Sequence, residues 1–259
     1  MKTYGPYERI RVTQAGPRLT VTLHYPERRN AIGPQMIGEL LETLEVSGRD
    51  ENVRVIVLTG EGKTFCAGGD FGQMSDLTGP PPRGDYADLL LSMWRTEKPI
   101  IARVNGHALG GGLGLVAAST LAIAAETALL GTPEVEVGLF PMMIMAVLSR
   151  LMPRRRLVEM MLLGQKLRAQ EAKDVGLIGS VVPLEALDDA VTVMVDALAS
   201  KSASTIRLGL RALVDHEEKE LRDALPMLRE RLAECLSTED AREGLTAFLE
   251  KRPPRWTDH

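Results

Sequence analysis

The sequence has few of the residues on which several classes of protein depend. Its two cysteines, Cys66 and Cys235, lie far apart, and with only four histidines they form neither a disulfide framework nor a metal-ligand motif. A net charge of −4 argues against a broad basic surface for nucleic acid. The longest apolar stretch, Phe140–Leu148, is too short to span a membrane, and Met1–Pro6 has no apolar signal segment. These absences predict a soluble, cytoplasmic protein with reduced thiols and with no metal, nucleic-acid or membrane partner.

Apolar patterns typical of strands and of helices alternate along the 259 residues. Leu19–Leu23 alternates apolar residues with threonine, Val53–Thr59 and Leu121–Ala125 are short apolar runs, and Gln35–Leu44 has an apolar helical stripe. After Pro183 the pattern becomes helical. Leucines at three- and four-residue spacing then form one stripe, which can fold back on its own core or pack on a neighbour: Leu221, Leu225, Leu228, Leu232 and Leu236. The pattern predicts one α/β domain with a helical tail.

The segment Lys98–Leu115 combines a buried strand, a glycine cluster and the start of a helix. Glycines at such a junction let backbone N–H groups approach a ligand closely, and the helix N-terminus adds free N–H groups and partial positive charge. No Gly-Lys-Ser/Thr follows the cluster, which excludes a P-loop. The segment favours binding of an oxyanion, although a close strand–helix packing turn explains the glycines equally well.

A second strand also ends in a turn of small residues, because Phe65–Asp70 follows Val53–Thr59. Two such turns can each direct one backbone N–H at a single oxygen. This arrangement stabilises a thioester enolate or a tetrahedral oxyanion, and the loss of one donor typically costs about 3 kcal/mol.

With these segments in view, the chain resembles the enoyl-CoA hydratase/isomerase (crotonase) family. The matching blocks lie in the family's order and cover essentially the whole chain: Pro26–Ala31, Phe65–Asp70, Lys98–Leu115, Gly131–Leu139 and Glu243–Arg252. The resemblance implies an α/β fold, a crotonase-like spiral of ββα units over residues 1–195. It also implies a C-terminal helical region, residues 196–259, that assembles a homotrimer or a hexamer (a dimer of trimers).

The resemblance further implies roles for individual residues. The amides of Gly69 and Gly111 would form the oxyanion hole and Glu134 would be the catalytic acid/base. The substrate would be an acyl-CoA, with no cofactor besides the coenzyme A that it carries. The implied substrate contacts are Arg28, Arg29, Ala31, Ala67, Gly69, Asp70, Gly111 and, reaching an adjacent subunit, Phe248 and Lys251. Ordinary solvated cations explain Arg28 and Arg29 about equally well.

Glu134 lies in a tight turn among apolar neighbours. Desolvation there would raise its pKa toward neutrality, as proton transfer requires. The residues around Glu134, taken alone, favour a solvated glutamate over a catalytic one. The family resemblance instead favours the catalytic carboxylate. Glu136 would point the same way if the segment were extended, but we expect it to face solvent. Asp70 is expected to brace the first glycine turn by accepting local N–H groups.

Gly114 departs from the family pattern, in which hydratases usually carry a second glutamate at this position. One carboxylate suffices to move a proton between C2 and C4 of an enoyl-CoA, whereas hydration also needs a positioned water. The sequence therefore favours double-bond isomerisation and leaves hydration open. Two alternatives also stay open: a catalytically idle CoA-binding or scaffolding homologue, and a CoA-thioester hydrolase or decarboxylase.

Two further segments carry expectations. The methionine-rich run Pro141–Ala146 is expected to be packed core rather than a pliable acyl pocket. Thr78–Gly84, with its three prolines, is expected to be a loop before a helix at Tyr86–Trp94. In the resembled family this loop region covers the acyl pocket.

Overall fold

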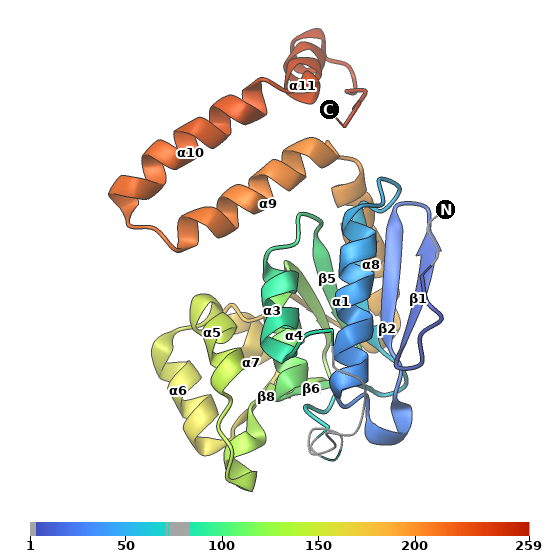
Figure 1. Cartoon of the computed structure of the whole chain (residues 1–259), viewed down its shortest axis with the longest axis vertical. Coiled ribbons are helices and arrows are strands. Elements are labelled where there is room, and N and C mark those ends of the chain that lie inside the picture. The colour runs from blue at the N-terminus through green and yellow to red at the C-terminus, as the bar shows by residue number, and fades with distance from the viewer. Residues whose placement is uncertain (1–3, 71, 73–82, 259) are drawn as a thin grey trace.

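The computed structural model describes residues 4–70, 72 and 83–258 (Figure 1). Within them a larger sheet has the strand order β1-β2-β3-β5-β7-β10, parallel except for the β1–β2 hairpin. A smaller sheet has the order β4-β6-β8-β9, in which only β9 is antiparallel. The strands are β1 Ile10–Ala15, β2 Arg18–Leu23, β3 Val55–Gly60, β4 Thr64–Cys66, β5 Ile100–Val104, β6 His107–Leu109, β7 Leu121–Ala125, β8 Leu129–Gly131, β9 Lys166–Arg168 and β10 Ser180–Val182.

The chain repeatedly places one strand in the larger sheet, the next strand in the smaller sheet, and then a helix. The units β3–β4–α3, β5–β6–α4 and β7–β8–α5 follow this order. The predicted spiral of ββα units is therefore confirmed. The helices are α1 Pro34–Gly48, α3 Tyr86–Trp94, α4 Gly111–Ala118, α5 Met142–Leu151, α6 Arg154–Leu163, α7 Ala169–Asp174, α8 Leu187–Ala199, α9 Ala203–Glu217, α10 Leu221–Leu236 and α11 Glu239–Glu250, with 3₁₀ turns at Pro26–Arg28, Pro133–Val137 and Leu184–Ala186.

The larger sheet is covered on both faces, which explains the apolar runs along its central strands. All six residues of β3 are buried. Side chains on one face, such as Ile56 and Leu58, join the main core under α1, α3 and α4, while Val55 and Val57 pack against α8. A parallel strand with two covered faces needs apolar residues at successive positions. Strand β2 is half-buried instead and keeps the predicted alternation.

The last three helices form a layer of their own at one end of the molecule in Figure 1, linked to the rest of the chain by ion pairs such as Arg54–Asp258 and Arg211–Glu97. They pack chiefly on one another. Ser202 caps α9 and Thr238 caps α11, each by accepting a backbone N–H at 3.0 Å. The predicted division between residues 195 and 196 falls inside α8, whose buried Val195 still packs on the sheet. The separate layer begins with α9.

Candidate active site

The second glycine cluster forms a sharp turn between β6 and α4. Gly110 has a φ of +50°, a conformation that favours glycine, and its N–H donates to the Gly131 carbonyl at the end of β8 (2.9 Å). Helix α4 begins at the next residue, Gly111. An amide in the first turn of a helix has no acceptor within that helix, so the Gly111 N–H is available to a ligand.

The first glycine turn, after β4, lies against the segment that follows β2. The Gly68 carbonyl accepts the Ile32 N–H and the Asp70 N–H donates to the Ile32 carbonyl, both at 2.8 Å. The Gly69 amide lies between these two bonds. Over residues 4–70, 72 and 83–258, neither the Gly69 nor the Gly111 amide donates a hydrogen bond.

The two turns and one carboxylate meet at the same place. A Cβ built on Gly68 would lie 3.9 Å from the Gly111 nitrogen, and one built on Gly110 would lie 3.6 Å from the Gly68 Cα. The latter would also lie 2.9 Å from Oε1 of Glu134. A side chain at Gly110 would therefore collide with the carboxylate. The structure brings together the two predicted oxyanion donors and the predicted acid/base.

Glu134 stands on the 3₁₀ helix Pro133–Val137 and has an unpaired buried oxygen. Its Oε2 has no hydrogen-bond partner among the described residues. Burial raises the pKa of this carboxyl above its ordinary value, and a bond to its own backbone N–H opposes the shift. Because the segment is a 3₁₀ helix rather than an extended strand, Glu136 points elsewhere and is exposed, as predicted. Glu134 can accept a proton from a substrate atom that reaches Oε2.

The space beside Gly114 is occupied by two side chains from other elements. A Cβ at Gly114 would lie 2.2 Å from the Tyr86 hydroxyl and 2.4 Å from Cγ2 of Ile144. Tyr86 and Ile144 thus stand where a second acidic side chain would have to start. The sequence analysis missed Tyr86, because nothing near it in the sequence signals a contact with residues on α4.

Two polar side chains bond to the backbone within or just before the first turn. Asp70 is buried and accepts the Gly72 N–H at 3.2 Å, a local bond of the predicted kind. The amide of Asn30 donates to the carbonyls of Glu61 (3.0 Å) and Thr64 (2.8 Å). The sequence analysis missed Asn30, although a left-handed backbone with φ of 58° is a conformation that asparagine tolerates.

Cys66 is fully buried, and burial raises the pKa of its thiol to about 12. This thiol stays protonated at neutral pH and is a poor nucleophile. Over the described residues no group of three His, Cys, Asp or Glu side chains could hold a metal ion.

The predicted substrate contacts divide into two groups. Four of them flank the first turn: the Ala67 N–H donates to the Arg29 carbonyl (3.0 Å) and the Ala31 N–H to the Arg28 carbonyl (3.1 Å). Both arginines are exposed there. The other group, Phe248 and Lys251, lies at the end of α11, which Figure 1 shows far from β6 and β8. A single chain does not bring that group to Glu134.

The methionine-rich run does not form core, contrary to the prediction. It forms the first turn of α5, in which Ile144 is 3% exposed. Met142, Met143 and Met145 are 64%, 48% and 37% exposed. They face outward because α5 presents only one side to α4. The predicted loop over Thr78–Gly84 lies largely outside the described residues, so its role as a cover stays a prediction.

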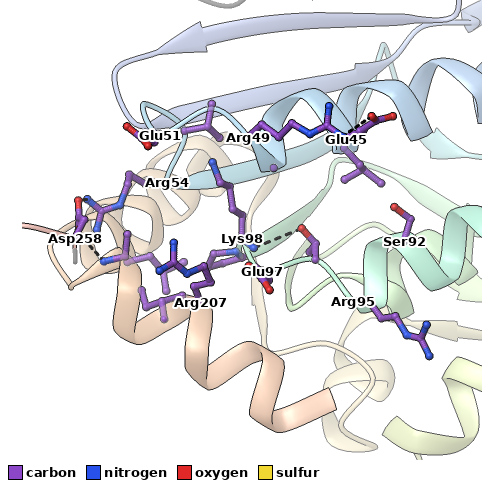
Figure 2. A pocket seen from close by; sticks show the side chains of 18 of the residues that line it. Glu45, Arg49, Glu51, Arg54, Ser92, Arg95, Glu97, Lys98, Arg207 and Asp258 are labelled. Carbon is purple, nitrogen blue, oxygen red and sulfur yellow. Dashed lines mark hydrogen bonds and ion pairs between the residues drawn. The ribbon is translucent and has the colours of Figure 1, made fainter. Parts of the chain in front are cut away.

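A separate cavity of about 780 Å³ lies between the end of α1 and the start of α9 (Figure 2). Arg54 pairs there with Asp258 at 3.0 Å, and the Lys98 ammonium donates to the Asp50 carbonyl. None of the predicted site residues is among those that line it. Among the described residues, no helix is long and apolar enough to cross a membrane.

Comparison with known proteins shows the family to which the chain is similar. The enoyl-CoA hydratase/isomerase family matches residues 18–259. A probable mitochondrial enoyl-CoA hydratase of Dictyostelium discoideum is 35% identical over 241 residues, covering 91% of this chain and 86% of that protein. The rat mitochondrial enoyl-CoA hydratase domain-containing protein 3 is 33% identical over 265 residues, covering 98% and 87%.

Solved structures of similar proteins have the same fold. An enoyl-CoA hydratase from Mycobacterium smegmatis superposes with a TM-score of 0.90 at 32% identity, covering 96% of this chain and 99% of that one. Human enoyl coenzyme A hydratase domain-containing protein 3 superposes with a TM-score of 0.91 at 28% identity, covering 96% and 100%. The chain belongs to the enoyl-CoA hydratase/isomerase family and has the crotonase fold. The names of the two curated relatives place those proteins in mitochondria, and a cytoplasmic location for this chain stays a prediction.

Proposed function

We propose that this protein shifts the double bond of an enoyl-CoA thioester, with Glu134 as the only acid/base group. The observation that carries the proposal is the unpaired, buried Oε2 of Glu134, on a carboxylate that adjoins the turn at Gly110, which in turn lies against the turn at Gly68. Burial raises the pKa of Glu134, which suits a group that must take up a proton and return it.

The reaction needs one proton and no added water. The Glu134 carboxylate takes a proton from C2 of a 3-enoyl thioester, and the C–H electron pair moves into an enolate. The amides of Gly69 and Gly111 donate to the thioester oxygen that becomes negative. The Glu134 carboxylic acid then returns the proton to C4, and the double bond forms between C2 and C3.

Isomerisation is favoured over hydration because the space beside Gly114 is filled. Hydration requires a group that orients water, and Tyr86 and Ile144 stand where a second carboxylate would begin. For the same reason, we expect that a Gly114→Glu variant would not gain hydration, because its side chain would overlap Tyr86 and Ile144. The barrier to this variant is steric, since Gly114 has no positive φ.

The test replaces Glu134 by glutamine. Glu134→Gln keeps the shape of the side chain and removes the base, so turnover of a 3-enoyl-CoA should fall by roughly 100- to 10,000-fold while thioester binding is nearly unchanged. Absorbance of the conjugated product follows the reaction, and calorimetry follows binding. Glu136→Gln, on the same 3₁₀ helix but exposed, is the matched control. Unchanged turnover in Glu134→Gln would rule out the assignment.

We further propose that the chain assembles as a trimer or a dimer of trimers. The proposal rests on α10 and α11, where Leu225 is 58%, Phe248 80% and Leu249 79% exposed. In such an assembly Phe248 and Lys251 would reach the coenzyme A of a neighbouring subunit, while Arg28 and Arg29 would contact its phosphates from the same chain as Glu134.

A further inference from the structure

Tyr86 occupies a fixed position at the first residue of α3. The side chain of Asp85 accepts the Asp88 N–H at 3.0 Å, and the side chain of Asp88 accepts the Asp85 N–H at 2.9 Å. This capping box fixes the first turn of the helix. The Tyr86 side chain points into the core and the residue is 7% exposed.

The Tyr86 hydroxyl donates to the Gly111 carbonyl at 2.5 Å. Burial, together with Cys66 and Glu134, raises the pKa of Tyr86 well above its ordinary value. The hydroxyl therefore keeps its proton and remains a donor at neutral pH. The ring also limits the space around Gly111, where a Cβ would lie 3.5 Å from both Cζ of Tyr86 and Cδ1 of Ile32.

Gly111 needs such a restraint because the start of α4 is intrinsically flexible. Three of its first four residues are glycines, at positions 111, 112 and 114. Glycine has the largest backbone freedom of any residue, whereas an oxyanion donor must point accurately at one atom. A hydrogen bond to the carbonyl of Gly111 restrains the same residue whose N–H faces the substrate oxygen.

We propose that Tyr86 is a positioning residue that holds the Gly111 amide in its oxyanion-binding orientation by its bond to the Gly111 carbonyl. The inference rests on the proposed function and adds to it. Loss of an oxyanion donor typically costs about 100- to 1,000-fold in kcat, and misplacing one should cost less, about 10- to 100-fold. KM should change by less than about threefold, because the hydroxyl stabilises the transition state through Gly111 and does not bind the thioester itself.

The test uses crotonyl-CoA labelled with ¹³C at the thioester carbonyl. Binding to the wild-type protein should move the carbonyl resonance downfield, because the two amides polarise the C=O bond. Tyr86→Phe should lose most of this displacement and 10- to 100-fold in kcat on a 3-enoyl-CoA. Tyr4→Phe is the matched control, since it removes a partly buried hydroxyl that donates to Asp50 at 3.3 Å rather than to a residue of α4.

A second variant removes the same bond without touching the tyrosine. In Gly114→Ala the new methyl group would lie 2.2 Å from the Tyr86 hydroxyl and 2.4 Å from Cγ2 of Ile144, so both side chains should shift and the bond to the Gly111 carbonyl should be lost. The same loss of carbonyl polarisation is expected. If Tyr86→Phe does not fold, Gly114→Ala decides the question.

The outcomes separate this inference from the proposed function. A displaced resonance in wild type that is equally displaced in Tyr86→Phe or Gly114→Ala, with kcat unchanged, would overturn the role of Tyr86 alone. Glu134→Gln should keep the displacement and lose turnover. A wild-type complex without any displacement would overturn the oxyanion hole, and with it both proposals.

Discussion

Helix α4 and the C-terminal helices differ in how much of their surface the chain itself covers. Seven of the eight residues of α4 are buried, among them Leu113, Leu115 and Val116. On α10 only Ala224 is buried, and on α11 only Asp240 and Ala247. Leu232 and Leu245 remain 58% and 59% exposed. The residues around Glu134 are therefore packed within one chain, whereas α10 and α11 have apolar faces that a single chain leaves uncovered.

The largest expected effect comes from charging the uncovered face. In Leu225→Asp/Leu232→Asp, each replacement removes a leucine whose burial in an assembly would contribute about 1.5–3 kcal/mol. We expect the variant to elute as a single chain with unchanged helix content, while the wild-type chain is a trimer or hexamer by light scattering.

The control for this variant is Glu230→Lys, an exposed charge reversal on the opposite face of the same helix, which should leave the mass unchanged. A wild-type protein that is monomeric at micromolar concentration would contradict the proposed assembly. It would also leave Phe248 and Lys251 without a role at the site.

An effect of intermediate size is expected on the free energy of unfolding when each of two helical glycines is replaced by alanine. A Cβ at Gly112 in α4 would lie 2.5 Å from the Cys66 carbonyl oxygen, whereas one at Gly209 in α9 meets nothing within 4 Å. Gly112→Ala should lower the free energy of unfolding by about 1–3 kcal/mol. Gly209→Ala should raise it by up to about 1 kcal/mol, because alanine favours helix. Denaturant titration measures both, and equal shifts in the two variants would show that α4 is less tightly packed than described.

The smallest expected effect is on the pH dependence of stability. Glu134 has a raised pKa, so the folded state binds its proton more tightly than the unfolded chain. The free energy of unfolding therefore decreases as pH rises through that pKa. Glu134→Gln should be more stable than wild type at pH 7, and the difference should disappear at acidic pH, below the ordinary glutamate pKa of about 4.3. A difference that does not depend on pH would show that the carboxyl is not desolvated.

The same group sets the pH dependence of the rate. Only the carboxylate form of Glu134 can take a proton from C2, so kcat/KM should rise with pH to a plateau, with an apparent pKa above the ordinary glutamate value. The pH profile of Glu136→Gln should be identical to that of wild type.

The parts of the site that a local pattern of residues specifies can be predicted from the sequence. Lys98–Leu115 indicates a strand, a glycine turn and a helix, and the structure has them as β5, the turn at Gly110 and α4. The same segment does not reveal β6, because three residues between glycines are too short for a readable period. The 3₁₀ helix at Glu134 is missed for a related reason, since Pro133–Val137 is only five residues long.

Contacts between residues that are far apart in the sequence could not be predicted from the sequence. The bond from Tyr86 to Gly111 joins two helices, and no local pattern distinguishes this tyrosine from another core aromatic. Whether Met142 and Met143 are exposed depends on which other elements pack against α5. The sequence of the run itself gives no information about those elements. Most of the C-terminal leucine stripe is exposed in a single chain, which is compatible with packing on a neighbour, and the assembly itself stays a prediction.

Glu134 is the single carboxylate on which all of the proposed chemistry depends. The direct measurement is the ratio of isomerisation to hydration by the wild-type protein, with a 3-enoyl-CoA and a 2-enoyl-CoA of equal chain length. Because general acid–base help from a lost group is worth roughly 100- to 10,000-fold, we predict that isomerisation is faster by at least about 100-fold. Efficient hydration of crotonyl-CoA would contradict the account, because it would show that Glu134 positions water without a second acid.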